Sequence, residues 1–150
     1  MNKKILAILA GVIFIGTILF FSFNKSVNEE EMKVLIKEIY NENEQIINVI
    51  KDELMSKDGE MYVYYQNGEV VCDNVNFDEE TKNNIALYFT AIDEKLDSAI
   101  RIRELFGERV IEFSFYDKRN KMDRGIIYTS DTQGYDHIEN NWYVYSYGLV

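Results

Sequence analysis

The sequence predicts an α+β fold: an N-terminal transmembrane helix, then a small domain with two helices packed on one face of an antiparallel sheet of four to six strands. Three observations lead to this class. Residues 5–23 form an uncharged apolar run, two later stretches have the spacing of amphipathic helices, and other segments alternate apolar and polar residues. Short links between the later strands favour antiparallel neighbours. We expect a cytoplasmic tail at 1–4, a signal anchor at 5–23 and a single extracytoplasmic domain at 24–150.

The apolar run at 5–23 is expected to cross the cell membrane once. At 1.5 Å per residue it would be about 28 Å long, close to the ~30 Å hydrocarbon core of a bilayer. Lys3 and Lys4 precede it, and because basic residues favour the cytoplasmic side, the N-terminus is expected inside and residues 28–150 outside. A cleaved signal peptide is the alternative. It is disfavoured because the run exceeds the usual ~7–15 apolar residues and ends without an Ala-x-Ala site.

A helix is predicted over residues 29–56. Asn28 precedes three glutamates, a pattern that caps a helix and places acidic groups at its positive end. Apolar side chains then recur at helical spacing: Met32, Leu35, Ile39, Ile46, Ile50 and Leu54. Gly59 is the expected terminator, because glycine readily takes the left-handed conformation that ends many helices.

A β-hairpin is predicted over residues 60–73. Its turn is Asn67-Gly68, because these two residue types tolerate the positive φ angles of a two-residue hairpin loop. The flanking runs are rich in Tyr and Val, which favour strands. Cys72 at the end of the hairpin is expected to be a small buried apolar residue.

A second helix is predicted to start at a cap provided by Asn76 or Asp78. Its apolar stripe follows helical spacing: Ile85, Tyr88, Phe89, Ile92 and Leu96. Residues 98–106 leave two alternatives, a strand or a continuation of the helix as far as Gly107. The alternation of apolar and basic residues in this segment favours the strand.

The rest of the chain is predicted to be three strands joined by a turn and a loop: strands at 109–117, 124–130 and 142–147, a polar turn at 118–123 and a loop at 131–141. Ile111, Phe113 and Phe115 alternate along the first of these strands. We expect them to face the helices, because aliphatic and Phe side chains gain most from full burial.

Charge and composition exclude several classes of protein. Residues 28–150 hold 13 basic and 26 acidic side chains, so binding to nucleic acid or to anionic lipid headgroups is not expected. A single cysteine, Cys72, and a single histidine, His137, exclude an intrachain disulfide and any site that needs two imidazoles. No cofactor and no metal site are predicted. Abundant Ile, Asn, Lys and Tyr resemble the composition of exported proteins from AT-rich Gram-positive bacteria.

Tyrosines are the candidate binding residues, and the chain has 11 of them. Tyr62 and Tyr64 share one face of a predicted strand, while Tyr143, Tyr145 and Tyr147 share one face of the last strand. An exposed row of such rings can bind a sugar or a peptide, because each offers an apolar ring and a polar tip. The alternative is that the rings only pair across strands of a half-solvated sheet.

These observations favour a non-catalytic, membrane-anchored extracytoplasmic interaction domain, with a protein or a cell-wall glycan as its partner. One alternative is a membrane-anchored envelope hydrolase that uses carboxylates or His137, and a second is an accessory subunit of a membrane complex. No phosphate-binding, dinucleotide-binding, serine-hydrolase or zinc-protease motif occurs. Their absence removes the positive case for an enzyme without excluding one, and no catalytic residue is assigned. The oligomeric state is left open.

Overall fold

The computed structural model describes five parts of the chain: residues 29–72, 75–92, 97–117, 122–132 and 134–148. The anchor expected at 5–23 lies outside these residues. Within them, no helix is both long and apolar enough to cross a membrane.

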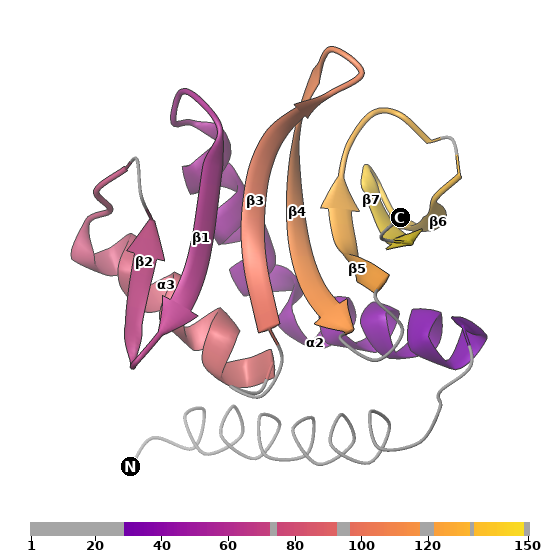
Figure 1. Cartoon of the computed structure of the whole chain (residues 1–150), viewed down its shortest axis with the longest axis horizontal. Coiled ribbons are helices and arrows are strands. Elements are labelled where there is room, and N and C mark those ends of the chain that lie inside the picture. The colour runs from indigo at the N-terminus through magenta and orange to yellow at the C-terminus, as the bar shows by residue number, and fades with distance from the viewer. Residues whose placement is uncertain (1–28, 73–74, 93–96, 118–121, 133, 149–150) are drawn as a thin grey trace.

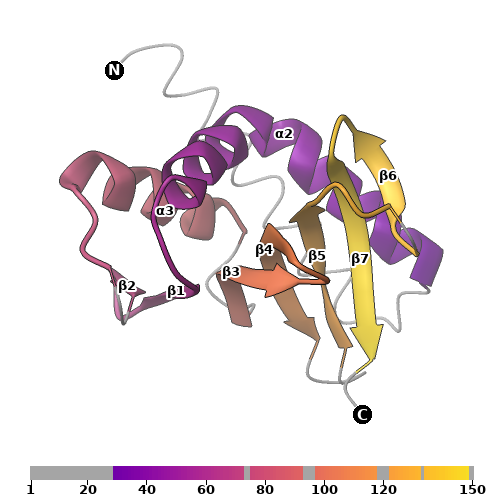
Figure 2. The same cartoon turned by 90° about the horizontal axis from the view of Figure 1, so that it is seen from above.

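Two helices and seven strands make up the described part of the fold: α2 (Glu29–Met55), β1 (Met61–Gln66), β2 (Glu69–Cys72), α3 (Glu79–Ile92), β3 (Asp97–Leu105), β4 (Glu108–Asp117), β5 (Met122–Tyr128), β6 (Asp136–Glu139) and β7 (Trp142–Gly148). The strands form one sheet in the order β2-β1-β3-β4-β5-β7-β6, and every neighbouring pair is antiparallel. Both helices lie on the same side of this sheet (Figures 1 and 2).

Most of the predicted elements are confirmed. Helix α2 ends at Met55, close to the expected residue. Gly59 has a positive φ of 82° but lies four residues beyond this end, so its expected role as the helix terminator was wrong. The hairpin turn has φ angles of 54° at Asn67 and 85° at Gly68. Asp78 rather than Asn76 caps α3, because its Oδ1 accepts a hydrogen bond of 2.8 Å from the Thr81 amide. Residues 98–106 contain most of a strand, β3, and no helix.

The strand count of four to six was wrong, because the sheet has seven strands. The extra strand, β6, lies inside residues 131–141, which were predicted to be a loop. Its sequence, Asp-His-Ile-Glu, is too short and too polar to show strand alternation. Its pairing partner is β7, and the register shifts between His137 and Glu139. Such a strand is defined by its neighbour rather than by its own composition. Strand β5 also begins earlier than expected, at Met122 inside the predicted polar turn.

The main core lies between the helices and the sheet. Ile111, Phe113 and Phe115 belong to it, which confirms the face assigned to them. Two hydrogen bonds join α2 to the C-terminal strands: Tyr40 donates to Glu139 Oε1 at 2.8 Å, and Trp142 Nε1 donates to Asn48 Oδ1 at 3.1 Å. The helices therefore cover one face of the sheet, and the opposite face is available for another role.

Candidate functional site

The sheet face that points away from the helices carries all five candidate tyrosines. Strand register places Tyr62, Arg101, Glu112, Ile127 and Tyr143 opposite one another in a single row that crosses five strands. Because side chains alternate along a strand, residues two positions away in the same strands lie on the same face. The predicted face of the tyrosines is therefore confirmed, and the two groups share one surface. We call this surface the helix-free face.

The expected exposure of the last strand's tyrosines was wrong. Tyr143 and Tyr145 retain only 6% and 1% of their exposed surface, because they pack with Val110 and Ile127 in a second apolar cluster. Partly buried side chains pack against this cluster: Leu105, Tyr135 and Tyr147. Tyr143 and Tyr145 therefore cannot form an exposed binding row.

The remaining candidate tyrosines keep some contact with solvent. Tyr62 is 51% exposed, and Tyr64 and Tyr147 are half-buried. The rings of Tyr62 and Tyr64 lie side by side, with 5.7 Å between their centroids. This pair on β1 is the part of the predicted tyrosine surface that a partner can reach most directly.

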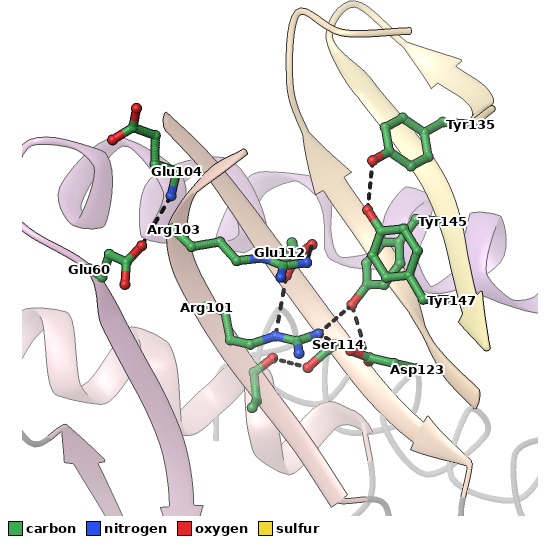
Figure 3. A network of polar contacts seen from close by, with 11 residues as sticks. Glu60, Arg101, Arg103, Glu104, Glu112, Ser114, Asp123, Tyr135, Tyr145 and Tyr147 are labelled. Atoms are coloured by element: carbon green, nitrogen blue, oxygen red, sulfur yellow. Dashed lines mark hydrogen bonds and ion pairs between the residues drawn. The ribbon is translucent and has the colours of Figure 1, made fainter. Parts of the chain in front are cut away.

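A network of ion pairs and hydrogen bonds crosses the helix-free face (Figure 3). At its centre is Glu112 of β4, whose side chain is 0% exposed. Arg103 Nη2 donates to its Oε1 at 2.6 Å, and Arg101 Nε lies 3.3 Å from its Oε2. Arg101 Nη2 also donates to Asp123 and, at 3.0 Å, to the Tyr145 hydroxyl. The network links β3 to β7, although two strands lie between them.

Small residues leave room for this crossing. Ala99, Ser114 and Gly125 lie opposite one another on β3, β4 and β5, and Tyr145 on β7 completes their row. Gly125 has no side chain, and a Cβ there would lie 2.0 Å from the Phe113 carbonyl oxygen. Because these three residues have small side chains or none, the long side chains of Arg101 and Tyr145 can lie over them and meet across the sheet.

Burial and charge fix the protonation of the network. Burial raises the pKa of Tyr145 well above its ordinary value, and the nearby carboxylates raise it further. Burial also raises the pKa of Tyr147, as does the 2.6 Å hydrogen bond between the Tyr147 and Tyr135 hydroxyls. Burial opposes the charge of Arg101, but its hydrogen bond to Asp123 and the negative charges of Asp123 and Glu112 outweigh burial, so the Arg101 pKa is raised. At neutral pH the arginine is charged and the tyrosines are neutral.

Five residues of the helix-free face remain accessible to solvent, and we call this set the tyrosine–arginine face: Tyr62, Tyr64, Arg101, Arg103 and Tyr147. The side chains of Arg101 and Arg103 are 23% and 34% exposed. The Arg103 guanidinium carbon lies 5.9 Å from the centroid of the Tyr147 ring, within the range of a cation–π contact.

The single histidine and the single cysteine of the chain, His137 and Cys72, lie on β6 and β2, the strands at opposite edges of the sheet. His137 is exposed, and its Nε2 lies 3.1 Å from the Asn140 carbonyl oxygen. Cys72 is half-buried and packs against the main core. Within the described ranges, no three His, Cys, Asp or Glu residues are grouped so that they could hold a metal ion.

An acidic groove lies between α2 and α3, with a volume of about 440 Å³. Asp52, Glu53, Asp78 and Glu80 are among its lining residues. A glycosidase would need one carboxyl with a raised pKa as its general acid. The pKa of Asp78 is instead lowered, because the Thr81 amide and hydroxyl donate to its carboxylate. Glu53 is paired with Lys57 at 2.6 Å. The groove does not favour the hydrolase alternative.

Comparison with family models, curated proteins and solved structures finds no match to this chain. Its function has to be inferred from the site itself. Sequence reasoning did not single out Arg101, Arg103, Glu112 or Asp123. The available signal was the placement of Glu112 and the two arginines on alternate positions of neighbouring strands, but only the strand register shows that their charges oppose.

Proposed function

We propose that this chain is a membrane-anchored, extracytoplasmic interaction domain without catalytic function, and that the tyrosine–arginine face binds its partner. The observation that supports this most is the anchoring of partly exposed arginines to buried carboxylates beside accessible tyrosine rings. The uncharged run at 5–23, preceded by Lys3 and Lys4, supports the membrane location.

Tyr and Arg are the residue types most enriched at protein interfaces, and both can contribute large parts of a binding energy. A long arginine side chain normally loses rotamer freedom when it binds. Here Arg101 and Arg103 are already held by Glu112 and Asp123, so that loss has occurred on folding. A surface held in this way binds with a smaller entropic cost.

The charge of the face narrows the class of partner. The two arginines are matched by two carboxylates, Glu112 and Asp123, so the face itself is close to neutral. The whole domain is acidic, which disfavours anionic partners. A neutral cell-wall glycan or a neutral-to-basic protein surface fits these properties.

Serine substitutions at Tyr62 and Tyr64 in the full-length chain test the proposal. We expect Tyr62→Ser with Tyr64→Ser to weaken binding to purified cell-wall glycan, or to a basic peptide, by about tenfold. The melting temperature should stay within a few degrees, because Tyr62 is 51% exposed.

Leu87→Ser is the matched control, because Leu87 is 58% exposed on α3, on the helical side of the sheet. It should leave binding unchanged. Two results would contradict the proposed function. Either both variants weaken binding equally, or the wild-type chain binds neither the glycan nor the peptide.

A further inference from the structure

The tip of the β3–β4 hairpin presents a phenylalanine to solvent. The turn residues Phe106 and Gly107 have φ angles of 52° and 83°, and Leu105 pairs with Glu108 across the turn. Both positive angles are those of a type I′ turn. The Phe106 side chain is 86% exposed, the largest value among the exposed large apolar residues of the described chain. Figure 1 shows this hairpin projecting beyond the ends of the neighbouring strands.

Phenylalanine is an unfavourable residue for this position. A bulky side chain at positive φ is strained, and Asn or Gly is preferred in such a turn. The chain itself has Asn at the two other described positions with positive φ at a non-glycine residue, Asn67 at 54° and Asn140 at 47°. Phe106 therefore adds backbone strain and exposed apolar surface at a position where asparagine would fit. Strain of this kind, when retained, is a reason to look for a function.

We infer that Phe106 is an anchor residue that inserts into an apolar pocket on a protein partner, and that the pocket is rimmed by basic groups. The basic rim of the pocket is inferred from the acidic residues near the tip. Glu104 is exposed beside the turn, and the Glu60 carboxylate lies 3.5 Å from its main-chain nitrogen. Glu108 follows the turn directly and accepts a hydrogen bond from Ser130. This inference is independent of the tyrosine–arginine face.

One basic residue of the hairpin keeps its charge near the tip. Arg103 pairs with Glu112, whereas Arg109 Nη2 donates to the neutral main-chain carbonyl of Lys57 and so remains positively charged. The carboxylates of Glu60, Glu104 and Glu108 outnumber this arginine. The surface around Phe106 is therefore acidic on balance, and its complement on a partner is an apolar pocket with Lys or Arg at the rim.

A lipid bilayer is a poorer occupant than a protein pocket, because carboxylates near the tip are repelled by anionic headgroups.

The first measurement is the thermal stability of the full-length chain in phosphatidylcholine nanodiscs. Phe106→Asn should raise the melting temperature by about 2–5 °C, because it relieves strain in the turn. An unchanged or lower melting temperature would show that the ring stabilises the fold, and the inference would then lose its basis.

The second measurement is selection of a phage-displayed library of random twelve-residue peptides on the same nanodisc-bound chain, with Phe106→Asn as the counter-selection. We expect enriched peptides that combine Lys or Arg with apolar residues, bind the wild type at least tenfold more tightly than Phe106→Asn, and bind Leu87→Asn like the wild type. Three results would overturn the inference: no enrichment over the variant, a Phe106-dependent dimer in analytical ultracentrifugation, or Phe106-dependent binding to phosphatidylcholine–phosphatidylglycerol vesicles.

Discussion

Glu112 is a carboxylate with a fully buried side chain, placed between two guanidinium groups of the neighbouring strand. Moving an unpaired carboxylate out of water costs several kcal/mol, so its burial requires Arg101 and Arg103. The alternation of Glu112 and Ser114 with apolar neighbours correctly predicts that they share one face. It also predicts that this face contacts solvent, which is wrong for Glu112. Burial arises from side chains that cross several strands, and strand alternation alone carries no information about that crossing.

Two tyrosines that are buried to the same extent, Tyr88 and Tyr145, are expected to differ in what their hydroxyls contribute to stability. Tyr145 accepts a hydrogen bond from Arg101, whereas the Tyr88 hydroxyl is buried with no hydrogen-bond partner among the described residues. Tyr145→Phe should lower the free energy of unfolding by about 1–2 kcal/mol. Tyr88→Phe should change it by less than about 0.5 kcal/mol or increase it, because an unpaired polar group leaves the core.

Urea unfolding followed by the fluorescence of Trp142, the single tryptophan, measures both changes. A larger loss for Tyr88→Phe than for Tyr145→Phe would contradict the hydrogen-bond assignment.

The Asp78 cap makes stability depend on pH. Its pKa is lowered from the ordinary value of 3.8, because the folded chain donates hydrogen bonds to the ionised carboxylate. The stabilisation is therefore fully present above pH 3.8 and is lost as the pH falls through the lowered pKa. Asp78→Ala should lower the melting temperature at pH 7, and its difference from the wild type should shrink on acidification below pH 3.8.

Asp78→Asn is the control for this titration, because asparagine caps a helix without ionising. It should stay close to the wild type at pH 7. A gap between Asp78→Ala and the wild type that is the same at pH 7 and in acid would show that the carboxylate charge does not contribute.

Helices and hairpins with local signals were predictable at the scale of elements. Apolar periodicity defined both helices, and Asn67-Gly68 defined the first hairpin, because their determinants lie close together in sequence. Strand β6 was not predictable, because its pairing depends on β7 and its own residues are mostly polar. The turn at Phe106 was missed for a different reason: phenylalanine is not a turn-forming residue, and its positive φ of 52° is visible only in the folded backbone.

The contact between β4 and β5 depends on Gly125. A Cβ at this position would lie 2.0 Å from the Phe113 carbonyl oxygen, so a side chain would force the two central strands apart. Gly125→Ala should lower the free energy of unfolding by about 3 kcal/mol or more. Gly68→Ala is the comparison, because its Cβ would meet nothing within 4 Å and only the φ of 85° opposes it, at a cost of about 1 kcal/mol. Equal costs in chemical denaturation would contradict the close approach.

At the scale of the whole molecule, one layer of helices and one sheet enclose the main core, and the helix-free face has a second, smaller core of its own. The α+β class and the packing of helices on one side followed from the sequence. The second core did not, because it depends on how residues from four strands meet across the sheet.

Residues 28–150 are expected to fold as a soluble domain without metal or disulfide, and Phe113 measures the contribution of its core. Phe113 is fully buried between the sheet and α3, and its ring lies 5.0 Å from that of Tyr88. Phe113→Ala should lower the free energy of unfolding by about 3–5 kcal/mol. A loss below about 1 kcal/mol, or unfolding of the wild-type domain by a chelator, would contradict this prediction.

Cysteine labelling in intact cells that naturally make the protein tests the central claim, that the domain lies outside the membrane and binds through the helix-free face. The background is Cys72→Ser, since Cys72 is the single cysteine of the chain. Gln66→Cys reports on the tyrosine–arginine face, because Gln66 is exposed and shares the face of Tyr62 and Tyr64 on β1 without belonging to the binding set. Leu87→Cys reports on the helical side, at a position with 58% exposure. A membrane-impermeant maleimide should label position 87 in intact cells, and position 66 only after purification in detergent, when the partner has dissociated. No labelling at either position until the cells are lysed would place the domain inside the cell, and equal labelling of both positions in intact cells would show that no partner covers the face.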